Sequence, residues 1–111
     1  MTERDRLFLA HILAAIADIE SFTNEGRGTF MSDRKTQSAV VRQLAIVGEA
    51  VKNLSPALVA SEPAVPWRLI AGARDRLIHA YDAVWSMVER DLPALRENVQ
   101  RIMGRGAPTP S

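Results

Sequence analysis

Apolar residues recur at steps of three and four along nearly the whole chain, and this spacing constrains the possible fold more than any other feature. It places them on one face of successive α-helices. The first stripe comprises Leu9, Ile12, Leu13, Ile16 and Ile19. The second stripe comprises Val40, Val41, Leu44, Val47, Val51 and Leu54. No segment alternates polar and apolar residues as a half-buried strand does, so the chain is predicted to be all-α.

Capping residues and helix breakers predict where the first two helices begin and end. Thr2 is a suitable N-cap for the first helix. Residues 24–28 include two glycines and are predicted to form the loop after it. The second helix should begin with Ser32 or Asp33 as its N-cap. Gly48 lies inside that helix at a cost of about 1 kcal/mol relative to alanine, so we expect another helix to approach closely there.

Prolines divide the second half of the chain. Ser55 followed by Pro56 predicts the start of a short helix, which Pro63 ends. A third major helix is expected from Pro66 to about Ala80, because apolar residues again recur at helical steps.

The last helix should begin with Asp82 as its N-cap, and Pro93 should interrupt or kink it. Its apolar stripe comprises Val84, Trp85, Val88, Leu92, Leu95, Val99, Ile102 and Met103. The predicted architecture is an antiparallel up-down bundle of four main helices and one short helix. It forms one helical domain over residues 1–103, and the Gly- and Pro-rich segment 104–111 is predicted to be a disordered tail.

Composition restricts the classes of function. The chain has 111 residues, no cysteine and two histidines, so we expect neither a disulfide nor a metal or other cofactor. The lack of cysteine suits the cytoplasm. The charged segment MTERDRLF does not resemble a signal peptide, and no apolar run reaches the ~20 residues of a membrane span. The net charge of +1 argues against a broad surface that coats nucleic acid.

The segment from Arg74 to Tyr81, with the sequence RDRLIHAY, is the most suggestive of chemistry. An arginine holds phosphate with a planar fork of donors. The imidazole of His79 can transfer a proton near neutral pH. The spacing alone is weak, because Arg6 and His11 repeat it. The tyrosine two residues after the histidine separates the two copies.

These residues could cleave RNA without a metal. His79 would transfer the proton, Arg74 would stabilise charge on the phosphoryl oxygens, and Asp75 would orient the imidazole. On one ideal helix Arg74 and His79 are about 140° apart. A homodimer that brings Arg74 of one chain near His79 of the other would solve that problem.

Purely structural explanations stay open for several residues. His79 could pair or cap at a helix C-terminus, and Tyr81 could be a core ring with its hydroxyl at the rim. Trp67 and Trp85 are expected to be core anchors rather than platforms for stacked bases. Glu49 is either buried and paired or exposed.

Four segments carry a family resemblance. In order they are HILAAI, AVVRQLAIVGEAVKNLS, VPWRLIAGARDRLIHAYD and VWSMVERDLPAL. Together they resemble the HepT-like members of the HEPN superfamily, the toxin halves of prokaryotic toxin–antitoxin pairs, from about Arg6 to Ile102. The resemblance implies a HEPN-like bundle that forms a homodimer. It also implies a metal-independent endoribonuclease whose active site lies at the dimer interface and whose targets include RNA such as tRNA.

The resemblance also implies roles for single residues. Arg74 and His79 match the family's catalytic pair, and Asp75 matches the polar position after the arginine. Tyr81 matches a tyrosine to which, in some members, the antitoxin transfers AMP. That antitoxin resembles a minimal, MntA-like nucleotidyltransferase of a type VII-like system, and it could join the homodimer in a larger complex. An AMP group beside Arg74 and His79 would block RNA entry.

One feature departs from the family's pattern. Family members often carry several more residues between the tyrosine and the following Val-Trp, whereas only residues 82–83 separate Tyr81 from Val84 here. The shorter connection is expected to tighten a turn beside the site. Two rivals to the toxin hypothesis remain: a non-enzymatic helical binding partner of a nucleotidyltransferase, and a general dimeric scaffold.

Overall fold

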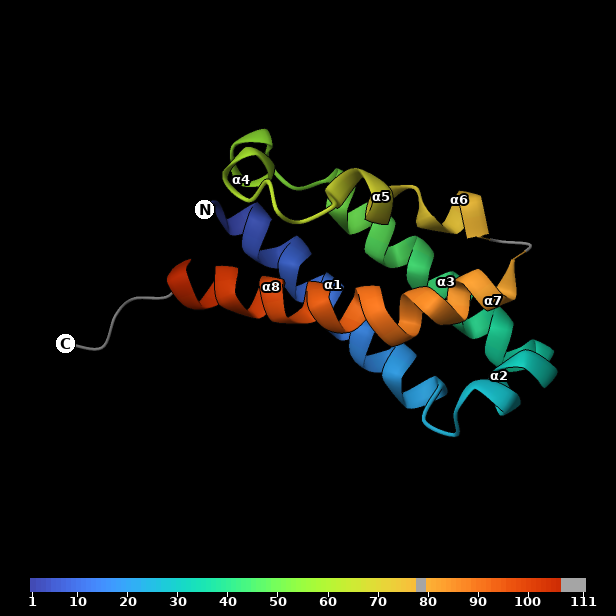
Figure 1. Cartoon of the computed structure of the whole chain (residues 1–111). Coiled ribbons are helices and arrows are strands. Elements are labelled where there is room, and N and C mark those ends of the chain that lie inside the picture. The colour runs from blue at the N-terminus through green and yellow to red at the C-terminus, as the bar shows by residue number, and fades with distance from the viewer. Residues whose placement is uncertain (78–79, 107–111) are drawn as a thin grey trace.

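The computed structural model describes residues 1–77 and 80–106, and all regular structure within them is helical (Figure 1). The elements are α1 (Glu3–Phe22), α2 (Arg27–Ser32), α3 (Arg34–Lys52), α4 (Pro56–Ser61), α5 (Trp67–Ala71), α6 (Ala73–Leu77), α7 (Tyr81–Ser86), the π-helical turn η1 (Met87–Asp91) and α8 (Leu92–Gly106). The predicted all-α fold is confirmed. No helix among the described residues is long and apolar enough to cross a membrane.

The helices form an elongated up-down bundle with extents of 49 × 27 × 20 Å (Figure 1). α1 and α3 pack against each other and run in opposite directions, and α8 returns along α1. α5 and α6 lie in succession against α3, and α2 contacts both α3 and α7. α3 therefore packs against both halves of the chain.

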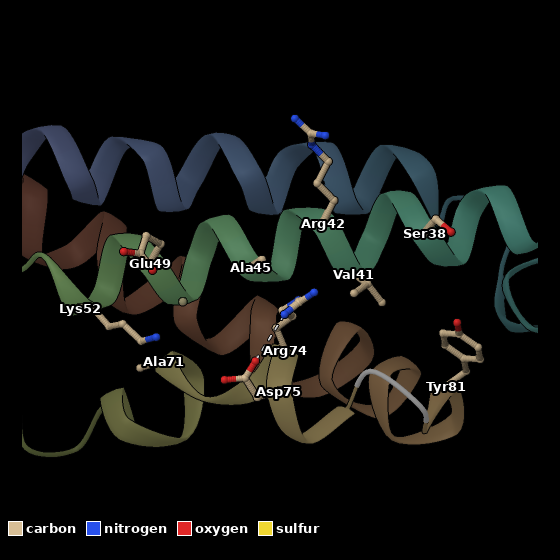
Figure 2. A pocket seen from close by; sticks show the side chains of 11 residues that line it. Ser38, Val41, Arg42, Ala45, Glu49, Lys52, Ala71, Arg74, Asp75 and Tyr81 are labelled. Carbon is tan, nitrogen blue, oxygen red and sulfur yellow. Dashed lines mark hydrogen bonds and ion pairs between the residues drawn. The ribbon is translucent and has the colours of Figure 1, made fainter.

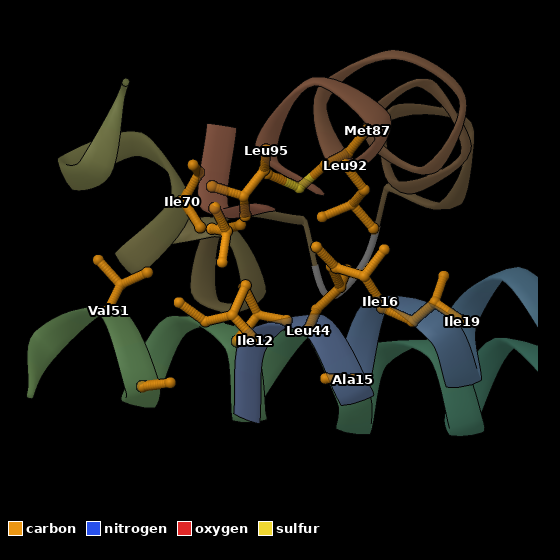
Figure 3. Packing of buried hydrophobic residues seen from close by; sticks show 14 of the residues in the cluster. Ile12, Ala15, Ile16, Ile19, Leu44, Val51, Ile70, Met87, Leu92 and Leu95 are labelled. Carbon is orange, nitrogen blue, oxygen red and sulfur yellow. The ribbon is translucent and has the colours of Figure 1, made fainter. Parts of the chain in front are cut away.

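The core lies between α1, α3 and α8, where their apolar stripes meet. Figure 3 shows Ile12 and Ile16 of α1 and Leu44 of α3 gathered beneath Leu92 and Leu95 of α8. All five side chains are at most 2% exposed, and burying such a side chain contributes about 1.5–3 kcal/mol.

Both tryptophans serve as core anchors, as predicted. Trp67 is buried, and its indole Nε1 donates a 3.1 Å hydrogen bond to the carbonyl oxygen of Glu62. Trp85 is half-buried, with its ring centroid 5.5 Å from that of Phe30. Each ring thus combines apolar packing with a fixed position in the bundle.

The predicted N-caps of α1, α3 and α4 are confirmed. Thr2 and Asp5 form a reciprocal capping box, and Asp33 accepts from the backbone N–H of Lys35. Ser55 caps α4, with Pro56 as its first residue. These side chains satisfy backbone N–H groups that would otherwise lack partners at the helix starts.

Asp5 also joins α1 to α4. Its carboxylate accepts the backbone N–H and the hydroxyl of Ser55, each at 2.8 Å, although the residue is only 1% exposed. Desolvation raises the pKa of Asp5, but the hydrogen bonds from Ser55 and Thr2 together outweigh it and hold the pKa below its ordinary value.

Two predicted helix boundaries in the second half of the chain are wrong. The third major helix is not continuous from Pro66 to Ala80, because α5 ends at Ala71 with Gly72 as its C-cap and α6 ends at Leu77. The last helix begins at Tyr81, with the backbone of Ala80 as N-cap and no capping side chain. Asp82 instead lies in its first turn, where a negative charge faces the positive end of the helix dipole.

The predicted loop and kink are also modified. Gly26 takes a φ of 94°, a conformation that glycine adopts without steric cost, and α2 already begins at the next residue. Pro93 does not break the last helix, because the π-helical turn Met87–Asp91 directly precedes its helix α8. Proline lacks a backbone N–H and crowds the carbonyl four residues earlier, and that carbonyl, of Glu89, lies within the wider turn. α8 runs to Gly106, beyond the boundary predicted at residue 103.

Glu62 connects the loop after α4 to the end of α8. Its side chain is 7% exposed, and Oε1 accepts a 2.6 Å hydrogen bond from Arg101, while Oε2 accepts one from Arg105. The hydrogen bond from Arg101 is the largest cause that lowers the pKa of Glu62, and it outweighs desolvation. The carboxylate is therefore more acidic in the folded chain than in the unfolded one.

Acidification should reveal the contribution of Glu62 to stability. Because the pKa is lowered on folding, the stabilisation is complete above the ordinary pKa of 4.5 and is lost as the pH falls through the folded-state value. Glu62→Gln should lower Tm at neutral pH and reduce the further fall of Tm on acidification, measured by circular dichroism. Glu20→Gln, which removes the exposed pair with Arg96, should change Tm less at neutral pH. Parallel Tm–pH curves for Glu62→Gln and wild type would contradict this assignment.

Candidate functional site

α3 has a second face, distinct from the one that enters the core. Its residues recur at the same three- and four-residue steps and mix small, polar and charged side chains. They are Ser38, Val41, Arg42, Ala45, Gly48, Glu49 and Lys52. The core stripe of α3 occupies a different face, with Val40, Leu44 and Val47 at most 2% exposed. α3 thus contributes to the core and to a solvent-facing wall at once.

A groove of about 600 Å³ lies between this wall and the helices that follow later in the chain (Figure 2). The opposite wall comprises Ala71 of α5, Arg74 and Asp75 of α6 and Tyr81 of α7. Three of the four residues predicted for the site, Arg74, Asp75 and Tyr81, therefore line one cavity.

Arg74 reaches into the groove from α6. Figure 2 shows its guanidinium directed toward α3 near Ala45. Its Nη1 lies 3.5 Å from Oδ1 of Asp75, and the two side chains are 49% and 75% exposed. A pair this long and exposed contributes at most about 1 kcal/mol. The guanidinium can therefore exchange this partner for an incoming phosphate at little cost.

A close backbone contact sets the position of α5 and α6 on α3. A Cβ atom added to Gly48 would lie 2.8 Å from the carbonyl oxygen of Ala71, a separation that Cβ atoms do not normally adopt. The predicted close approach at Gly48 is confirmed. Because α6 follows one residue after α5, this contact also sets the position of Arg74.

Tyr81 has both properties that the sequence left open. Its ring is half-buried and lies edge-on to fully buried Phe30, with centroids 6.3 Å apart, yet the residue also lines the groove. The short connection from Tyr81 to Val84 is part of helix α7 rather than a tightened turn. The tyrosine thus stands at the first position of a helix, anchored by its ring at one end of the groove (Figure 2).

His79 lies outside the described residues, so its partnership with Arg74 stays a prediction. The helical-wheel separation of about 140° assumed one helix through both positions, and that premise is wrong because α6 ends at Leu77. The second copy of the Arg-His spacing lies away from the groove. His11 is exposed on α1, where its ring lies edge-on to Phe8 with a centroid distance of 5.4 Å.

The sequence prediction omitted the α3 wall. Ser38, Arg42 and Lys52 were not considered for the site, and Glu49, which proves to be exposed, was left undecided. The signal was present as a second helical stripe beside the apolar one. Among the described residues, no group of three or more His, Cys, Asp and Glu is placed to hold a metal ion.

The fold and the groove define a small all-α protein with cationic and acidic side chains on facing walls. Its sequence matches the family described as Ribonuclease HepT-like over residues 12–102. "Probable ribonuclease HepT" of Thermococcus cleftensis is 42% identical over 101 residues, 86% of this chain and 92% of that protein. "Putative RNase MJ0127" of Methanocaldococcus jannaschii is 39% identical over 110 residues, 93% of this chain and 91% of that protein. No solved structure matches significantly. The chain belongs to the HepT-like ribonuclease family, as its four segments predicted.

The Gly48 contact can be tested with a matched pair of glycines. Gly48→Ala must displace the backbone of α5, which typically costs about 1–3 kcal/mol and is offset by up to about 1 kcal/mol of helix propensity. Gly104→Ala on α8 meets nothing within 4 Å and should be neutral or slightly stabilising. Urea denaturation measures both. Equal effects on the free energy of unfolding would show that the contact at Ala71 is not restrictive.

Proposed function

We propose that this protein is a metal-independent endoribonuclease and the toxin component of a type VII-like toxin–antitoxin pair. The observation that carries the proposal is the place of Arg74, half-exposed on the wall of a groove and held by one weak ion pair. The family assignment and the ribonuclease names of the relatives support it. The active unit is a homodimer in which the groove receives RNA.

The proposed reaction is transfer of a phosphoryl bond within the RNA strand. A base removes the proton of a ribose 2′-OH, the oxygen attacks the adjacent phosphorus, and the bond to the 5′-oxygen of the next nucleotide breaks. An acid protonates that leaving oxygen, and a 2′,3′-cyclic phosphate remains. His79 transfers protons, Arg74 stabilises the charge that builds on the phosphoryl oxygens, and Asp75 orients the imidazole. DNA lacks the 2′-OH and is not cleaved.

Regulation acts on the same groove. A nucleotidyltransferase-type antitoxin transfers AMP from ATP to the hydroxyl of Tyr81, with release of pyrophosphate. Because Tyr81 and Arg74 line one cavity, the added nucleotide occupies the space that RNA needs and brings a phosphate near the arginine. The anchored ring keeps the modified hydroxyl at the groove.

Removal of either catalytic side chain should abolish RNA cleavage while the fold persists. Arg74→Gln and His79→Ala should each lower the cleavage rate of cellular RNA in EDTA by at least about 100-fold, the usual loss when a charge-stabilising group is removed. Gel analysis and mapping of cyclic-phosphate ends give the readout.

The matched control for Arg74 is Arg68→Gln on the neighbouring helix α5, where the arginine is exposed and does not line the groove. It should retain wild-type cleavage. A folded Arg74→Gln or His79→Ala protein that cleaves at the wild-type rate would refute the proposed mechanism. An inactive wild type that still binds a nucleotidyltransferase would favour the non-enzymatic binding partner.

Tyr81→Phe should separate the nuclease from its regulation. The phenylalanine keeps the ring that packs on Phe30, so cleavage should stay within a few-fold of wild type, but no hydroxyl remains to accept AMP. Intact-protein mass spectrometry after incubation with antitoxin and ATP measures the modification. The same mass increase on Tyr81→Phe as on wild type would exclude Tyr81 as the acceptor.

A further inference from the structure

The chain contains two lysines, and both lie on α3 but on different faces. Lys35 is in the first turn and lines a shallow depression with Phe22, Thr36 and Ala39. Lys52 is the last residue of α3 and lines the groove that contains Arg74. The 17 positions between the lysines correspond to a rotation of about 260°, so the two ammonium groups face different surroundings.

Lys52 is a cation in the groove without an acidic partner. It is exposed and makes no ion pair with any carboxylate in the described part of the chain. Figure 2 shows its ammonium directed into the space between α3 and the following helices, as is the guanidinium of Arg74. Arg42 also lines the groove, but its side chain extends away from α6 in the same view.

Lys52 and Arg74 are too far apart along the groove to share one phosphate. Arg74 lies near Ala45 in Figure 2, and the seven positions from Ala45 to Lys52 correspond to about 10 Å along the helix axis. Successive phosphates in a stacked strand are about 3.4 Å apart along its axis, and farther apart when the strand is extended. The two cations therefore match different phosphates of one strand.

We propose that Lys52 is a second phosphate contact, which binds the backbone of single-stranded RNA away from the phosphate held by Arg74. The inference rests on the proposed ribonuclease function and deepens it. The substrate then has to extend along α3 beyond the cleaved bond, so a strand of several nucleotides binds better than a dinucleotide. Lys52 positions the strand and takes no part in the bond changes.

A lysine at the end of a helix also has a purely structural role, because its charge interacts favourably with the helix dipole. A test must therefore measure contact with RNA rather than stability. The presence of two lysines makes this possible, since each can be followed separately by peptide mass spectrometry after limited acetylation.

The first experiment is acetylation of the full-length protein with and without a short single-stranded RNA that carries 2′-O-methyl groups. Such an RNA has phosphates to bind but no 2′-OH nucleophile. Bound RNA should slow acetylation of Lys52 several-fold and leave Lys35 unchanged. Equal rates at Lys52 under saturating RNA would overturn the proposal. Equal protection by an acidic peptide of matched charge would also overturn it and would favour a protein partner.

The second experiment compares Lys52→Gln, Lys52→Arg and Lys35→Gln. Loss of one phosphate contact to a single strand should reduce the slope of log Kd against log salt concentration by about 0.7. Lys52→Gln should show this reduction and raise KM more than it lowers kcat. Lys52→Arg should restore the slope, because it keeps the charge. Lys35→Gln should behave as wild type.

The outcomes separate this inference from the proposed function. Cleavage that depends on Arg74, with an unprotected Lys52, would overturn the second contact and leave the ribonuclease intact. Protection of Lys52 in a wild-type protein that does not cleave RNA would support the contact and overturn the ribonuclease. Neither binding nor cleavage by the folded wild type would overturn both.

Discussion

The backbone contact between Gly48 and Ala71 controls where the candidate site lies. Since Gly48 has no side chain, α5 can approach α3 closely, and α6 then lies against the same helix. Arg74 projects from α6 toward the small side chain of Ala45 (Figure 2). A larger residue at Gly48 would push α5 outward. The groove thus depends on small residues where the two helices cross, and on charged residues along the space that remains.

Two carboxylates stabilise the end of the bundle that holds α4, the N-terminus and the end of α8 (Figure 1). Asp5 joins the starts of α1 and α4, and Glu62 joins the loop after α4 to the end of α8. At the other end, the rings of Phe30, Tyr81 and Trp85 pack together. The carboxylates are already saturated with donors, so they do not compete with a phosphate for Arg74. The aromatic end supports Tyr81 without placing charge there.

Strong, long patterns predicted most of the fold, and local backbone choices escaped prediction. The helices α1 and α3 and the caps Thr2, Asp33 and Ser55 follow from periodicity and capping chemistry. The break at Gly72 does not, because one glycine costs a helix only about 1 kcal/mol, and tertiary packing decides whether it continues. In the site, Arg74, Asp75 and Tyr81 were predicted. The α3 wall was not, since only the fold shows which face of α3 meets α6.

The groove explains how a chain with a net charge of +1 could recognise a polyanion. The described residues that line it include three cations, Arg42, Lys52 and Arg74, and two acids, Glu49 and Asp75. Such a surface produces little long-range attraction, so association would not be strongly steered. Recognition must instead come from phosphates that meet the cations at fixed positions while they avoid the acids. A duplex presents its phosphates on a stiff outer rim, whereas a single strand can bend into the groove, and this favours an unpaired RNA segment as the ligand.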